Sequence, residues 1–83
     1  MRTRTRTKRR YGALVKQTFV IANGNRLESN VPCSIEEFLV AQNLLPRSVV
    51  VEHNGEAVAP SEFPRRQVRE GDRLEIVKIV AGG

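Results

Sequence analysis

The chain has 83 residues, enough for one small domain whose core is close to the lower limit for unaided folding. Its single cysteine excludes an internal disulfide and a cysteine-only zinc site, which fits a reducing compartment. No apolar run approaches the roughly 18 residues that span a bilayer. The N-terminus also lacks the apolar core of a secretory signal, so we expect a cytoplasmic protein.

The net charge of +5 is concentrated at one end. Residues 1–18 contain seven basic side chains and no acid, whereas residues 19–83 contain seven basic and nine acidic side chains, a net charge of −2. We therefore predict a disordered basic extension over residues 1–17 and a folded domain over residues 18–83. The extension has three interpretations: a nonspecific phosphate-binding segment, an organellar transit peptide, or a segment without a role. We do not expect specific nucleic-acid binding, because a single Tyr offers little base stacking.

The first half of the domain predicts a hairpin and one helix. Asn23-Gly24 indicates a tight turn, because both residues tolerate positive φ, so residues 18–31 are expected to form a β-hairpin. Ser34 and Glu37 have the spacing of a capping box at the start of a helix of about ten residues. Asn43 is expected to end this helix in a left-handed conformation.

The second half predicts strands. Residues 49–53 are β-branched and precede a second Asn-Gly turn, which leads into a shorter strand over residues 56–59. A loop containing Phe63, a short β-segment at residues 67–68 and a turn at residues 70–72 follow. The order of elements indicates an α+β fold in which one helix packs on one sheet.

The last strand begins at Arg73 and runs into Gly82-Gly83. Strand alternation places Leu74 and Ile76 on the core face and Val77 and Ile79 on the other face. Exposed β-branched residues beside the end of the chain suggest a contact surface for a partner, so Val77 and Ile79 are candidate contact residues. Scattered apolar surface residues are also ordinary in globular proteins, so both interpretations stay open.

The glycine pair offers a chemical hypothesis. Glycines are poor strand residues and leave an unobstructed backbone, so Ala81, Gly82 and Gly83 are expected to form a thin tail that carries the α-carboxylate. An α-carboxylate with a pKa near 3.5 is ionised at pH 7 and can act as a nucleophile. We therefore expect the Gly83 carboxylate to be the reactive group; a frayed terminus is the alternative.

Several motifs in this order resemble the β-grasp, ubiquitin-like sulfur carriers, and among them the ThiS-type carriers of thiamine biosynthesis. The resemblance covers residues 18–83. It rests on the Asn-Gly hairpin, the helix opening Ser-Ile-Glu-Glu-Phe-Leu, and the runs Val50–Glu56, Val58–Phe63 and Glu70–Val77 ahead of Gly82-Gly83. The basic extension has no counterpart in the family pattern. Phe63 stands where Trp is common, and Ala81 where a third Gly often lies.

This resemblance implies a β-grasp with a mixed sheet of four to five strands on one helix. It implies a carrier and cosubstrate rather than an enzyme, with no bound cofactor and no metal. The tail of Ala81, Gly82 and Gly83 would enter the active sites of partner enzymes. A ThiF-like adenylating enzyme would use ATP and Mg²⁺ to adenylate Gly83, whose carboxylate is nucleophilic toward the α-phosphate of ATP and a poor electrophile until it is adenylated. A cysteine desulfurase or similar persulfide would supply the sulfur of a C-terminal thiocarboxylate. A ThiG-like thiazole synthase would then accept that sulfur. The molybdopterin-synthase type of sulfur carrier is the alternative within this fold.

Other candidate sites are weaker. Cys33 lies just before a helix N-terminus, which can lower a thiol pKa, but no basic partner lies nearby in sequence, so we expect it to be a passive buried residue. His53 is expected to be structural or exposed rather than a general base. The acids at residues 36, 37, 70 and 72 show no metal-binding spacing. A basic RNA-binding module with a ubiquitin-like core is the remaining alternative, although the excess positive charge lies in the extension.

Overall fold

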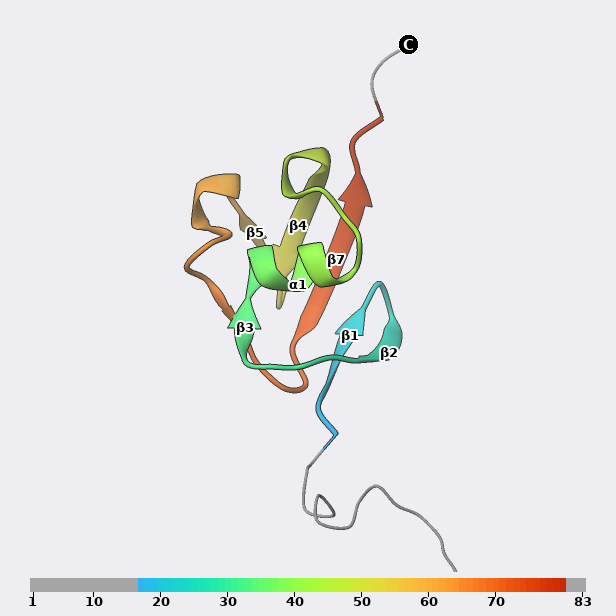
Figure 1. Cartoon of the computed structure of the whole chain (residues 1–83). Coiled ribbons are helices and arrows are strands. Elements are labelled where there is room, and N and C mark those ends of the chain that lie inside the picture. Colours follow the sequence, from blue (N-terminus) through green and yellow to red (C-terminus); the bar gives the residue numbers. More distant parts are fainter. Residues whose placement is uncertain (1–16, 81–83) are drawn as a thin grey trace, which may run out of the picture.

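A computed structural model describes residues 17–80, which form a five-stranded sheet crossed on one face by a helix (Figure 1). The strand order in the sheet is β2-β1-β7-β4-β5. The strands are β1 (Phe19–Ala22), β2 (Asn25–Glu28), β4 (Val49–His53), β5 (Glu56–Val58) and β7 (Arg73–Lys78). β1 and β7 are parallel and the other neighbours are antiparallel, so the mixed sheet and single helix confirm the predicted β-grasp.

Both Asn-Gly pairs form the tight turns that the sequence predicts. Asn23 and Gly24 have φ angles of 50° and 84°, and Asn54 and Gly55 have φ angles of 52° and 84°. Positive φ at both central residues gives a turn whose twist matches the flanking strands. The turns therefore fix the registers of β1 with β2 and of β4 with β5.

Helix α1 (Ile35–Ala41) begins at the predicted capping box. The Glu37 N–H donates to Ser34 Oγ at 3.0 Å, and the Ser34 N–H donates to Glu37 Oε1 at 2.9 Å. The helix has seven residues rather than about ten, and it ends at the predicted point, with Gln42 as its C-cap and Asn43 in the predicted left-handed conformation with φ 62°. Ile35, Phe38 and Leu39 are buried on the face that packs against the sheet.

A second, two-stranded sheet was not predicted as such. β3 (Cys33–Ser34) pairs antiparallel with β6 (Gln67–Val68), so the segment entering α1 is tied to the chain that leads to β7. Two 3₁₀ turns, η2 (Pro46–Ser48) and η3 (Pro60–Glu62), complete the described elements. Phe63, which follows η3, is 2% exposed and is therefore a core residue.

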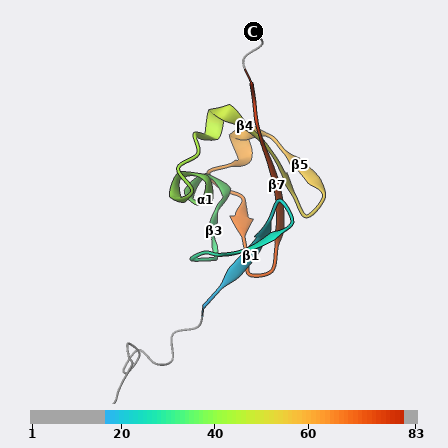
Figure 2. The same cartoon turned by 90° about the vertical axis from the view of Figure 1, so that its right-hand side faces the viewer.

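The core lies between α1 and the sheet. Its buried apolar side chains come from every layer of the fold: Val20, Ile35, Phe38, Leu39, Val49, Val51, Val58, Phe63, Val68 and Leu74. β7 is the central strand and points its C-terminal end away from the hairpin of β1 and β2, a direction that both views show (Figures 1 and 2). Among residues 17–80, no helix is long and apolar enough to cross a membrane.

Candidate functional site

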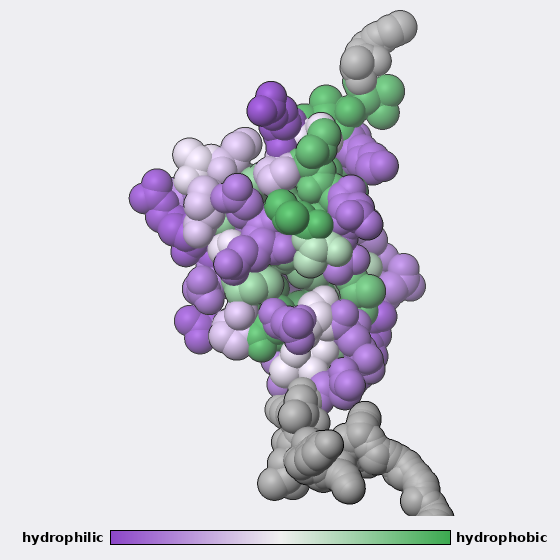
Figure 3. Space-filling view, in the orientation of Figure 1, coloured by the Kyte–Doolittle hydropathy of each residue, from purple (hydrophilic) through white to green (hydrophobic). Residues whose placement is uncertain are grey.

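The two candidate contact residues at the end of β7 are exposed. Val77 is 63% exposed and Ile79 is 57% exposed, and Val80 beyond them is 84% exposed. Val77 pairs across the sheet with Val50, which is 54% exposed, so apolar side chains lie side by side on the open face of the sheet. In the space-filling view, apolar residues also gather where the described chain ends (Figure 3). The geometry therefore permits a docking role for Val77 and Ile79.

Ala81, Gly82 and Gly83 lie outside the described residues. Their assignment as the tail that enters partner active sites, and that of Gly83 as the modified residue, therefore stays a prediction. Residues 1–16, which contain most of the predicted basic extension, also lie outside the described part.

Burial and hydrogen bonds on both sides anchor β7 and the residue that follows it in the domain. Leu74 is fully buried, and Ile76 is half-buried against the core. On one side, the Asn23 side chain binds the Ile76 backbone twice: Ile76 N–H donates to Asn23 Oδ1 at 2.7 Å, and Asn23 Nδ2 donates to the Ile76 carbonyl at 3.0 Å. On the other side, Ile79 N–H donates to the Ser48 carbonyl at 2.8 Å. These bonds fix the direction in which the chain leaves the sheet.

His53 is the centre of a polar cluster that the sequence did not predict. It is 6% exposed, and its Nε2 lies 2.7 Å from Asp72 Oδ2. Arg66 Nε donates to His53 Nδ1 at 3.0 Å, which assigns the neutral imidazole with its proton on Nε2. Arg66 also forms an ion pair with Glu56. Because both ring nitrogens are engaged and the ring is buried, His53 links β4 to the turn before β7 and has no free nitrogen for general-base chemistry.

The acids of this cluster are held in their charged forms. Burial alone would raise the pKa of the Asp72 carboxyl, but hydrogen bonds from the Arg69 backbone, His53 and Asn54 outweigh burial and lower this pKa below its usual range. The hydrogen bond and positive charge of Arg66 lower the pKa of Glu56. A carboxyl group with a lowered pKa stays ionised at neutral pH and is a weak base. Asp72 and Glu56 therefore stabilise the turn region and are not suited to proton transfer.

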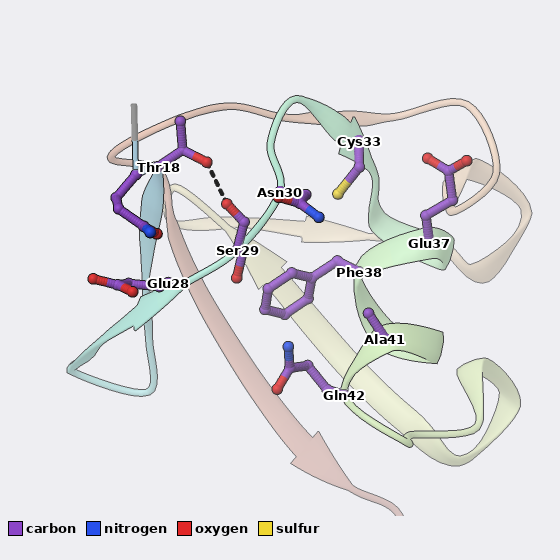
Figure 4. Close-up of a pocket in the computed structure, with 10 residues that line it drawn as sticks. Thr18, Glu28, Ser29, Asn30, Cys33, Glu37, Phe38, Ala41 and Gln42 are labelled. Carbon is purple, nitrogen blue, oxygen red and sulfur yellow. Dashed lines mark hydrogen bonds between the residues drawn. The ribbon is translucent and has the colours of Figure 1, made fainter. Parts of the chain in front are cut away.

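Cys33 lines a cleft of about 590 Å³ between the β1–β2 hairpin and α1 (Figure 4). Burial and the neighbouring Glu37 carboxylate both raise the pKa of its thiol, so the reactive thiolate is disfavoured at neutral pH. The Phe38 ring faces the same cleft, and Thr18 Oγ1 donates to the Ser29 carbonyl at its edge. The Ser29 hydroxyl is buried without a hydrogen-bond partner among the described residues. Cys33 is half-buried rather than buried as expected, and the raised pKa of its thiol fits the expected passive role.

No other cluster within residues 17–80 offers site chemistry. None of the described His, Cys, Asp and Glu side chains gather in a group of three that could hold a metal ion. His53 and Cys33 do not form a nucleophile–base pair, because the histidine nitrogens bind Asp72 and Arg66. The end of β7 is therefore the surface of the described domain that best suits a functional role.

Comparison with known proteins identifies the family to which this chain belongs. The model of the ThiS family matches residues 8–83, which is most of the chain. The match includes residues 8–17, so this part of the predicted basic extension does have a counterpart in the family, contrary to expectation. The chain belongs to the ThiS family. Because the matched segment runs through Gly83, it includes the tail that the sequence predicts to be functional.

Solved ThiS structures share this fold. A crystal structure of the thiamine biosynthesis protein ThiS from Geobacter metallireducens is 26% identical, with a TM-score of 0.68 over 78% of this chain and 99% of that chain. A solution structure of a thiamine biosynthesis protein from the same organism is also 26% identical, with a TM-score of 0.65 over 78% of this chain and 87% of that chain. The resemblance to ThiS-type carriers and the predicted β-grasp fold are both confirmed.

A curated relative is a much longer protein. A thiazole synthase from Paramagnetospirillum magneticum is 33% identical over 64 residues, which are 77% of this chain and 20% of that protein. The chain therefore spans about a fifth of the length of this relative. Together with the ThiS matches, this similarity supports the predicted role as a sulfur carrier in thiamine biosynthesis.

Proposed function

We propose that this ThiS-family chain carries sulfur as a thiocarboxylate on Gly83 and delivers it to a ThiG-like thiazole synthase. The observation that carries the proposal is the family match, which extends through residue 83. The glycine pair within this match follows β7, the central strand of the sheet. The similarity to a thiazole synthase favours the thiamine pathway over molybdopterin synthesis.

Activation takes place on a partner enzyme of the ThiF-like adenylating type. A Gly83 carboxylate oxygen attacks the α-phosphorus of ATP, which is bound with Mg²⁺ by the partner, and pyrophosphate leaves. Adenylation turns a poor electrophile into a reactive acyl phosphate anhydride. Glycine at residues 82 and 83 suits this step, because the backbone can enter a narrow active site in which a Cβ would clash.

Sulfur transfer then consumes the acyl-adenylate. The terminal sulfur of a persulfide, formed by a cysteine desulfurase or a similar donor, attacks the Gly83 carbonyl carbon and displaces AMP. A second thiol attacks the sulfur of the donor cysteine, which breaks the sulfur–sulfur bond, forms a disulfide and releases the thiocarboxylate. In this scheme the chain is a cosubstrate and supplies no catalytic side chain.

The exposed valines on the open sheet face support docking of a partner. Val50 and Val77 are opposite each other, and Ile79 continues the exposed apolar surface toward the tail. Burial of such side chains contributes roughly 25 cal/mol per Å² of apolar surface. A partner that covers this face would therefore hold the domain while the tail occupies its active site.

ATP–pyrophosphate exchange tests the activation step. A purified ThiF-like enzyme should catalyse the exchange with the full chain and fail with a chain that lacks Gly83. The Gly83→Ala variant should lose most of the exchange, because its Cβ clashes in the active site. Normal thiocarboxylate formation by the chain without Gly83 would exclude the proposal.

A further inference from the structure

The end of β7 has one paired side and one open side. Its first half lies between β1 and β4, with β1 pairing at Arg73 and Leu74. β4 continues along β7 as far as Lys78, whereas the hairpin ends sooner, so the upper part of β7 projects beyond it in both views (Figures 1 and 2).

Asn23 marks the point at which this pairing ends. The Ile21 N–H donates to the Asp72 carbonyl and the Asn23 N–H to the Leu74 carbonyl, both at 2.8 Å. At the next position on this side, the Asn23 side-chain amide replaces a strand and binds both backbone groups of Ile76. An amide can satisfy a donor and an acceptor at once, so it acts as a one-residue extension of the hairpin.

Beyond Ile76, the backbone of the same side is free of strand partners within residues 17–80. Hydrogen-bond direction alternates along a strand, and Ile79 N–H points to Ser48 on the β4 side. The N–H and C=O groups of Lys78 and Val80 therefore face the side on which the hairpin has ended. The flanking side chains of Val77, Ile79 and Val80 are all more than half exposed.

An open edge with apolar flanks is a template for another strand. We infer that the edge at Lys78 and Val80 binds an extended segment of the thiazole synthase by β-strand addition, which aligns the tail with the active site of the synthase. The inference rests on the proposed function, and it names the surface that the synthase recognises. Main-chain hydrogen bonds would supply part of the affinity, and Val77 and Ile79 would contact apolar side chains of the added strand.

The synthase is the occupant that the similarity supports. In the relative from Paramagnetospirillum magneticum, a region similar to this chain is part of a thiazole synthase polypeptide. Covalent linkage holds two domains at high effective concentration, so a surface beside the tail would be presented continuously to the synthase body. An edge of two residues is weak by itself, but it suits a contact that must form and dissociate in each cycle.

Amide hydrogen exchange of the full chain tests the inference directly. Purified thiazole synthase should slow exchange at the Lys78 and Val80 amides about ten-fold or more, as expected for newly formed main-chain hydrogen bonds. The Ile79 amide, which already donates to Ser48, should change less and serves as the internal reference. Unchanged exchange at Lys78 and Val80 in the complex would overturn the inference, as would protection by an adenylating enzyme but not by the synthase.

A matched pair of substitutions at Lys78 separates backbone from side chain. Lys78→Pro removes the N–H that faces the open edge without removing a hydrogen bond to β4, and it should weaken synthase binding about ten-fold. Lys78→Ala keeps that N–H and should bind within about two-fold of the original chain. Equal binding of the two variants would contradict strand addition. Thiocarboxylate formation by the unsubstituted chain, measured separately, reports on the proposed function, so either hypothesis can fail alone.

Discussion

His53 Nε2 and Asp72 Oδ2 lie 2.7 Å apart and join the last residue of β4 to the turn that precedes β7. The same carboxylate oxygen accepts the Arg69 N–H at 2.8 Å, so one side chain holds both the turn and the neighbouring strand. Since β7 leads to the predicted reactive tail, this pair fixes the start of the strand that carries the tail.

Substitution of Asp72 should measurably destabilise the domain. Asp72→Ala removes the acceptor of both bonds and leaves the buried His53 Nε2–H unsatisfied, so we expect the free energy of unfolding to fall by about 2 kcal/mol. Urea denaturation monitored by circular dichroism gives this value. Glu52→Ala is the matched control, because the exposed Glu52 lies opposite Glu75 and its removal should cost less than about 0.5 kcal/mol. Equal losses in both variants would contradict the role of Asp72.

The contribution of Asp72 should depend on pH. Because its pKa is lower in the folded state, the stabilisation is complete above the unfolded carboxyl pKa of about 3.9 and is lost as pH falls through the lower folded pKa. The difference in unfolding free energy between the original chain and Asp72→Asn should therefore shrink below about pH 4. Denaturation at several pH values measures it, and a difference that grows with acid would contradict the assignment.

Cys33 should react slowly with thiol reagents. Burial and the Glu37 carboxylate raise the pKa of the thiol, so its rate with Ellman's reagent at pH 7 should be below that of free cysteine. Glu37→Gln removes the charge while it retains a side chain that can complete the capping box, and the rate should increase. Glu36→Gln lies on the same helix turn and serves as the control. A rate equal to that of free cysteine would contradict the passive role.

Val77 should contribute to docking but little to folding. Val77→Lys places a charge in the exposed apolar face, so we expect the KM for the carrier in the adenylation reaction to rise about ten-fold with little change in thermal stability. Val40→Lys is the control, since Val40 is 58% exposed on α1, away from the sheet face. The same KM for the two variants would remove Val77 from the contact surface.

Local chemistry explains which parts of the fold were predictable. The two Asn-Gly turns, the Ser34–Glu37 capping box and the β-branched run over residues 49–53 each depend on neighbours in sequence, and all appear where expected. The two-residue strands β3 and β6 are too short to carry a period. The sequence predicts the β-segment at residues 67–68, which is β6, but neither β3 nor the pairing of the two strands.

Long-range polar contacts explain the rest. His53 is separated by 19 residues from Asp72 and by 13 from Arg66, so no periodic pattern of residues indicates their cluster. Asn23 was predicted as a turn residue, but its side chain also binds Ile76, 53 residues away. Such contacts depend on the topology of the sheet, in which the last strand returns between the first and the fourth.

Intact mass of the chain after incubation with an adenylating enzyme, ATP, Mg²⁺ and a persulfide donor tests the central claim most directly. Replacement of one carboxylate oxygen by sulfur should add about 16 Da, and fragmentation should place the added mass on Gly83. The increase should require ATP and be absent from the chain without Gly83. An unchanged mass under these conditions, or an addition located at Cys33, would contradict the assignment of Gly83 as the sulfur carrier.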